Sequence, residues 1–146
     1  MGAAPGRGRV AALDLGTRRI GVAYSDSGRT IASPWGTIER SGDPARDRAA
    51  VLEAVREVEA STVVVGLPLS LSGDVGPAAR AALEEAAALR ALLEPLGVSV
   101  ETADERFTTV EAERSLAAAG RRGKAARRVV DSAAAMVLLQ AWLDRT

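Results

Sequence analysis

The sequence contains no cysteine and no histidine, and only 3% of its 146 residues are aromatic. The absence of cysteine excludes a disulfide framework and makes a reducing cytoplasm the expected setting. The absence of both residue types also removes imidazole bases, thiolate nucleophiles and the metal sites built from them. Any chemistry that this chain performs must therefore rely on carboxylates, hydroxyls and hard cations.

The chain also lacks an excess of charge and a long apolar run. Its 19 basic residues balance 19 acidic ones, so a nucleic-acid site would have to be a local patch. Basic residues cluster at Arg18 and Arg19 and again within residues 121–128. No segment approaches the roughly 18 apolar residues of a membrane helix, and the first residues lack the apolar core of a secretory signal. We therefore expect a cytoplasmic protein with no membrane partner.

The length and local patterns predict one domain. Residues 1–8, rich in glycine and arginine, predict a flexible tail, and residues 9–146 predict a single folded unit. Short β-prone runs at 10–15 and 20–24 predict an antiparallel hairpin. The run at 31–38 contains Pro34, which favours an edge strand because proline cannot donate a backbone hydrogen bond.

Strands and helices alternate in the rest of the chain. Helices are expected to begin at Pro44 and Pro77, and strands are expected at 62–66 and 98–103. A short helix at about 108–120 and a final helix at 124–143 complete the order. This order predicts an α/β fold: a mixed five-stranded sheet, with the later strands parallel to the first, flanked by about four helices.

Three acidic residues occur where a solvated carboxylate is least expected. Asp14 lies in an apolar run, Glu105 follows the fifth strand, and Asp131 interrupts an apolar stretch of the last helix. Ligands of open α/β sheets gather beyond the carboxyl ends of the parallel strands, and a closing helix can bring a third acid there. Converging carboxylates repel one another, and one or two Mg²⁺ or Mn²⁺ ions relieve that repulsion. Because such ions activate water and stabilise a leaving oxygen, the pattern predicts phosphodiester hydrolysis.

Each acid also has a simpler interpretation. Asp14 can accept hydrogen bonds from the amides of Gly16 and Thr17 in the turn that follows it. Asp131 can pair with the arginines one turn earlier on its helix. Asp104 is as good a candidate as Glu105 on local grounds alone, so the residues themselves do not decide between the two.

Basic residues precede Asp131 on the same side of the last helix. Helical geometry places Lys124, Arg127 and Arg128 within about 60° of its direction, where they would flank a metal site and contact a phosphate backbone. A solvated, charged start of the helix is the simpler alternative.

Four segments, in order, resemble the motifs of the YqgF/RuvX family: residues 14–26, 66–76, 104–109 and 124–143. The resemblance implies a ribonuclease H-like fold and a metal-dependent nuclease. Members of the family are described as candidate pre-16S rRNA nucleases that mature the 5′ end, and earlier as candidate Holliday junction resolvases. Carried over to this chain, the motifs assign the acidic site to Asp14, Glu105 and Asp131, which favours Glu105 over Asp104.

The resemblance also bears on the substrate. Related junction resolvases carry a fourth carboxylate on the last helix, where this chain has Ala134 and Ala135. We therefore favour pre-rRNA over branched DNA as the substrate, with a junction-resolvase-like DNA nuclease as the alternative, and expect cleavage with Mg²⁺ or Mn²⁺ held by the three acids. The residues expected to contact nucleic acid are Thr17, Arg18, Arg19, Arg106, Lys124, Arg127 and Arg128.

Two further interpretations belong to other functional classes. A non-catalytic module that binds nucleic acid or protein with the same fold predicts neither cleavage nor stabilisation by metal. A sugar kinase or actin-like ATPase has a phosphate loop that residues 14–17 also resemble. Such enzymes close two domains around a nucleotide, and a chain of 146 residues is too short for both.

Overall fold

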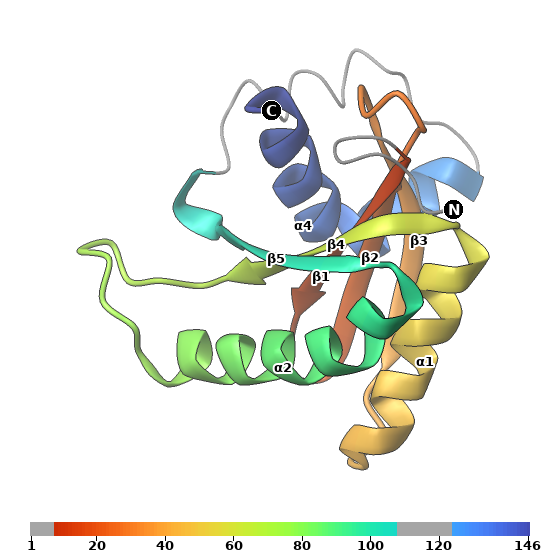
Figure 1. Ribbon diagram of the computed structural model, residues 1–146. Coiled ribbons are helices and arrows are strands. Elements are labelled where there is room, and N and C mark those ends of the chain that lie inside the picture. The colour runs from red at the N-terminus through yellow and green to blue at the C-terminus, as the bar shows by residue number, and fades with distance from the viewer. Residues whose placement is uncertain (1–7, 108–123) are drawn as a thin grey trace.

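A computed structural model shows a five-stranded mixed sheet with helices on both faces (Figure 1). It describes residues 8–107 and 124–146, and for residues 107 and 124–131 it describes the backbone alone. Most of the predicted tail and the helix predicted at 108–120 lie outside these ranges and stay predictions. The strands are β1 (Arg9–Leu15), β2 (Arg19–Ser25), β3 (Ala32–Glu39), β4 (Ala60–Leu67) and β5 (Ser99–Asp104). The helices are α1 (Pro44–Glu57), α2 (Pro77–Leu93) and α4 (Lys124–Asp144), with short 3₁₀ turns η1 (Glu94–Leu96) and η2 (Glu105–Phe107).

The strands follow the order β3-β2-β1-β4-β5 across the sheet. β1 pairs antiparallel with β2, and β2 with β3, whereas β4 is parallel to both β1 and β5. The predicted mixed sheet is therefore confirmed. The strand that contains Pro34 lies at an edge, as predicted, and the register of its pairing shifts between Val22 and Ala23, next to the proline.

Helices α1 and α2 cover one face of the sheet, and α4 covers the other (Figure 1). Alternate residues of a strand point to opposite faces. In β1, Ala11 and Leu13 pack in the cluster under α1 and α2, whereas Val10 and Ala12 pack in the cluster under α4. Asp14 is the next residue of β1 after Val10 and Ala12 to point to this side, so its side chain lies on the α4 face of the sheet.

The first two helices begin where the sequence predicts. The Asp43 carboxylate accepts a hydrogen bond from the Ala45 amide (3.1 Å) and caps α1, and proline occupies the first position of both α1 and α2. Residues 8–107 and 124–146 contain three α-helices, and the fourth predicted helix lies outside them. Across these residues, every helix is too short or too polar to span a membrane.

Helix α4 has a kink at Ser132, whose backbone angles (φ −121°, ψ 22°) are not helical. Beyond the kink, Met136 and Leu139 are fully buried. Gln140 is also buried: its Oε1 accepts from the Ala32 amide (3.0 Å), and its Nε2 donates to the Thr30 carbonyl (3.0 Å) and to Asp144 (2.9 Å). The kink thus separates the half of α4 that carries Asp131 from the half that packs on the sheet.

Candidate active site

Asp14 and Glu105 meet at the carboxyl ends of the parallel strands. Asp14 comes from β1 and Glu105 from the turn after β5, and β4 lies between these strands in the sheet. The Glu105 side chain crosses β4 at Gly66, where an added Cβ would lie 2.5 Å from Oε1 of Glu105. Gly21 is the pairing partner of Asp14 on β2, and a Cβ there would lie 3.6 Å from that of Asp14. Glycines on the two neighbouring strands therefore leave the space that the acids occupy.

The pKa of the Glu105 carboxyl is strongly raised. Burial is the largest cause, and together with the negative charge of Asp14, a hydrogen bond between the two side chains and the charge of Asp104 it raises the pKa of Glu105 to about 7. Two carboxyl groups can form a hydrogen bond only when one of them is protonated, and the raised pKa lets Glu105 keep its proton close to neutral pH in the metal-free protein.

The neighbouring acid, Asp104, has a different partner. Its oxygens accept from Nε (2.9 and 3.1 Å) and Nη2 (2.7 Å) of Arg106, and from the Arg106 amide (2.9 Å). These bonds hold the pKa of Asp104 below its usual value. The structure therefore places Glu105, rather than Asp104, against Asp14.

Backbone atoms close the turn after Asp14. The Gly16 amide donates to the main-chain oxygens of Asp14 (3.1 Å) and Arg19 (2.9 Å). An added Cβ on Gly16 would lie 2.6 Å from the same Arg19 oxygen, so this position requires glycine. The simpler interpretation of Asp14 was that its carboxylate accepts a hydrogen bond from the Gly16 amide. In the structure the Gly16 amide donates to main-chain oxygens, and the Asp14 carboxylate interacts with Glu105.

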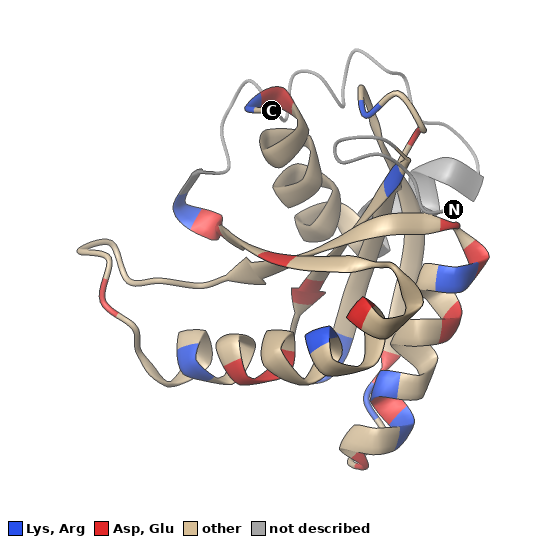
Figure 2. Ribbon diagram, viewed as in Figure 1, with Lys and Arg blue, Asp and Glu red and all other residues tan. Residues whose placement is uncertain are grey.

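A cleft of about 600 Å³, which we call the acid cleft, lies at the ends of the strands that carry the acid pair. Asp14, Thr17 and Glu105 line it together with Ala78, Ala81 and Ala82 of α2. Arg40, Arg48 and Glu85 also line it, and the sequence analysis did not single them out. No sequence pattern marks Arg40: it reaches the site because β3 pairs with β2 and so returns the chain to the turn beside Asp14. Figure 2 shows residues of both charges on α1 and α2.

The other residues predicted to act in the site fall into three groups. Thr17 and Arg18 are exposed in the β1–β2 turn. Arg19 pairs with Glu39 (3.0 Å), and Arg106 is bound to Asp104. The side chains of Asp131, Lys124, Arg127 and Arg128 lie outside the described residues, so their roles remain predictions. Within the part of the chain whose side chains are described, no three acids cluster as a metal site would require.

The loop between β4 and α2 borders the acid cleft through Pro68. Within the loop, Ser72 donates to Asp74 (2.8 Å) and the Gly73 amide donates to the Ser70 carbonyl (2.8 Å). Nη1 of Arg106 donates to the Leu71 carbonyl (3.2 Å). Arg106 thus connects this loop to the turn that carries Glu105.

Two solved structures of Holliday junction proteins have a similar fold. The structure titled "T. thermophilus RuvC in complex with Holliday junction substrate" matches with a TM-score of 0.59 and 15% identity, covering 94% of this chain and 96% of that chain. The yeast mitochondrial Holliday junction resolvase Ydc2 matches with a TM-score of 0.54 and 9% identity, covering 94% and 78%. At such identities the likeness shows the fold alone, and it confirms the predicted ribonuclease H-like architecture.

Sequence comparison extends over almost the whole chain. A family model described as "RuvX: Holliday junction resolvase" matches residues 8–145. A protein of Mycobacterium sp. (strain KMS) named "Putative pre-16S rRNA nuclease" is 45% identical over 141 residues, 97% of this chain and 82% of that protein. A protein of the same name from Mycobacterium ulcerans (strain Agy99) is 49% identical over 142 residues, 96% and 81%. The chain therefore belongs to the YqgF/RuvX family of nucleases.

Proposed function

We propose that this chain is a metal-dependent endonuclease of structured nucleic acid that processes the 5′ end of pre-16S rRNA in the cytoplasm. The observation that carries the proposal is the contact between Asp14 and Glu105 at the carboxyl ends of the parallel strands of a ribonuclease H-like sheet. Family membership supports nuclease activity, and the names of the relatives favour ribosomal RNA as the substrate.

The acid pair suits a divalent cation. Its donors are all oxygens, which Mg²⁺ and Mn²⁺ prefer, and a cation would replace the proton that the raised pKa keeps on Glu105. Asp14 and Glu105 would hold one or two ions, with Asp131 as the third ligand expected from the family motif. When bound, the ion lowers the pKa of a water molecule and neutralises charge on the phosphodiester.

The chain's own groups hold the substrate. Thr17 lies at the rim of the acid cleft and offers a hydroxyl and an exposed backbone to a phosphate oxygen. Arg18 in the same turn offers a guanidinium, whose planar fork matches a phosphate group. Attack of water on the phosphorus, with cleavage of the bond to the 3′ oxygen, leaves a 5′-phosphate and a 3′-hydroxyl.

A cleavage assay on defined substrates tests the proposal. The full chain is incubated with a 5′-extended precursor 16S rRNA fragment or a four-way DNA junction, in Mg²⁺, Mn²⁺ or EDTA. We expect metal-dependent cleavage of the RNA, and losses of more than about 100-fold for Asp14→Asn and Glu105→Gln, because even the outer partners of metal ligands contribute 10- to 100-fold. The matched control is Glu101→Gln, which removes an exposed carboxylate from β5 and is expected to cut normally.

The alternatives predict other outcomes. A junction resolvase cuts the four-way junction and leaves the RNA intact. An interaction module binds nucleic acid but cuts neither substrate with either ion. Equal cleavage by the wild type and by Asp14→Asn means that a contaminating nuclease is responsible, and the proposal then fails.

A further inference from the structure

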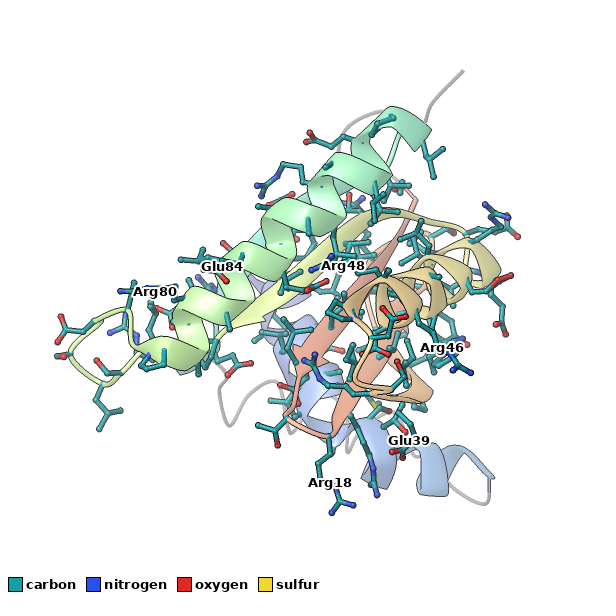
Figure 3. All side chains as sticks on the ribbon, turned by 90° about the horizontal axis from the view of Figure 1, so that it is seen from below. Arg18, Glu39, Arg46, Arg48, Arg80 and Glu84 are labelled. Atoms are coloured by element: carbon teal, nitrogen blue, oxygen red, sulfur yellow. The ribbon has the colours of Figure 1, made fainter. Side chains whose placement is uncertain are left out.

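A second cleft adjoins the acid cleft on the α1 side of the β1–β2 turn. It also measures about 600 Å³, and Arg18, Glu39, Arg40, Asp47 and Arg48 line it; we call it the arginine cleft. The two clefts share Leu15, Thr17, Arg40, Arg48 and Glu85 and are therefore direct neighbours. Figure 3 looks onto α1 and α2 and shows Arg48 in the space between these helices, with Arg18 beyond the end of the sheet.

The acidic side chains of the arginine cleft all have partners. Glu39 pairs with Arg19 (3.0 Å). Glu85 accepts two hydrogen bonds from Arg48, at 2.8 and 3.1 Å, and this pair joins α2 to α1. Asp47 accepts from the amide (2.9 Å) and the hydroxyl (2.7 Å) of Ser41. The Ser41 hydrogen bonds, together with the charges of Arg40 and Arg46, hold the pKa of Asp47 below its usual value.

Two arginines of the cleft keep donors available. The Arg40 amide donates to the Arg18 carbonyl (2.9 Å), and its Nε donates to the Gly16 carbonyl (2.7 Å). These bonds fix Arg40 to the turn that follows Asp14. Among the described residues, neither Arg18 nor Arg40 forms an ion pair within 4.0 Å, and the terminal nitrogens of Arg40 donate no hydrogen bond. Although the charged side chains that line the cleft balance, these two guanidiniums leave donors open to an anion at a fixed place beside the turn that follows Asp14.

We propose that the arginine cleft binds a phosphodiester of the substrate strand close to the cleaved bond, with Arg40 as the main contact and Arg18 as the second. This inference rests on the proposed function and adds a subsite to it. A guanidinium with free terminal nitrogens matches a phosphate in geometry and charge. A cleft of about 600 Å³ has the size that holds a small molecule, so it accepts one strand at about one nucleotide rather than a duplex.

Binding measurements locate the contact. The probe is a nuclease-resistant 2′-O-methyl RNA strand with the precursor sequence, in which one linkage at a time is a neutral methylphosphonate, titrated with the full chain in EDTA. Arg40→Gln and Arg18→Gln are compared with the wild type, and Arg56→Gln, at the opposite end of α1, is the control. Arg40→Lys keeps the positive charge but removes the planar guanidinium that can form two parallel hydrogen bonds to a phosphate. Thermal melting confirms that each variant is folded.

We expect Arg40→Gln to weaken binding of the native strand by about tenfold, as for the loss of one charged hydrogen-bonding contact. The slope of log K against log salt should fall by about 0.7, the value for one phosphate of a single strand. At one linkage near the cleaved bond, the methylphosphonate should weaken binding to the wild type but have no further effect on Arg40→Gln. Such non-additivity identifies two groups in contact. Arg40→Lys should retain the salt slope, and Arg56→Gln should match the wild type.

Additive effects of Arg40→Gln and the methylphosphonate at every linkage would overturn the subsite. If the wild type cuts RNA and Asp14→Asn does not, but Arg40→Gln binds normally, the subsite is wrong and the proposed function stands. If the wild type neither binds nor cuts any of the nucleic acids, the proposed function fails, and the subsite fails with it.

Discussion

Replacing Glu105 by glutamine should make the metal-free protein more stable at high pH but not at low pH. Folding raises the pKa of this carboxyl from 4.5 to about 7. Between these values the folded protein holds a proton that the unfolded chain has released, so the free energy of unfolding falls as the pH rises. Above about pH 7 the full cost is present, and below pH 4.5 it is absent. Glutamine does not titrate and removes this cost.

The magnitude follows from the same pKa values. Each pH unit between them corresponds to about 1.4 kcal/mol, which would give about 3 kcal/mol. Glu105 is only half-buried, and solvent screening reduces the expected difference to about 1–2 kcal/mol. For a chain of this length, such a difference raises Tm by roughly 2–8 °C.

Thermal and urea unfolding of the wild type and Glu105→Gln, in EDTA across a range of pH, measure the effect. The difference between the two proteins isolates Glu105 and its coupling to the neighbouring acids, because groups away from the acid pair titrate alike in both. Saturating Mg²⁺ or Mn²⁺ should stabilise the wild type, by about 1.4 kcal/mol at ten times the dissociation constant, and should stabilise the variant much less. A difference that stays constant with pH, or equal stabilisation of both proteins by metal, would refute the reasoning.

Three substitutions test other parts of the site and its support. Gly66→Ala places a Cβ 2.5 Å from the flexible end of the Glu105 side chain. We therefore expect a cleavage assay to show a loss of nuclease activity, and urea unfolding to show a destabilisation of only about 1–2 kcal/mol. An active variant would contradict the assigned position of Glu105. Gly16→Ala places a Cβ 2.6 Å from a backbone oxygen that cannot move alone, so it should destabilise more than Gly66→Ala in the same urea experiment. Asp43→Ala removes the cap of α1 and should cost about 1 kcal/mol without affecting the acid pair, whereas an unchanged urea midpoint would show that the cap is dispensable.

Local patterns were sufficient to predict most of the fold. The hairpin, the buried central strand β4 and the starts of α1 and α2 follow from short runs of residues and from prolines at fixed positions. Pro34 correctly marked an edge strand, because a proline in the interior of a sheet would leave an acceptor without a donor. The kink at Ser132 had no such signal, since neither glycine nor proline stands there.

The site was less predictable, because it depends on residues far apart in the chain. That Glu105 rather than Asp104 faces Asp14 depends on how β5 ends and on the Arg106 guanidinium, which binds Asp104. The residues alone left this choice open, and the family motif favoured Glu105, the acid that lies against Asp14 in the structure. Arg40 enters the site only because β3 returns beside the turn after Asp14, a consequence of strand register that no local pattern contains.

Gln140 has a consequence for how the last helix is positioned. Apolar packing alone would allow α4 to slide along the sheet at little cost, since Leu and Met side chains fit many neighbours. The buried Gln140 amide has its partners on residues 30 and 32 at only one setting of the helix, and any shift would leave polar atoms unsatisfied in the interior. The side-chain amide of Gln140, in the second half of α4, thus prevents the helix from shifting along the sheet. It fixes how far along the sheet this helix, which also carries Asp131, is placed.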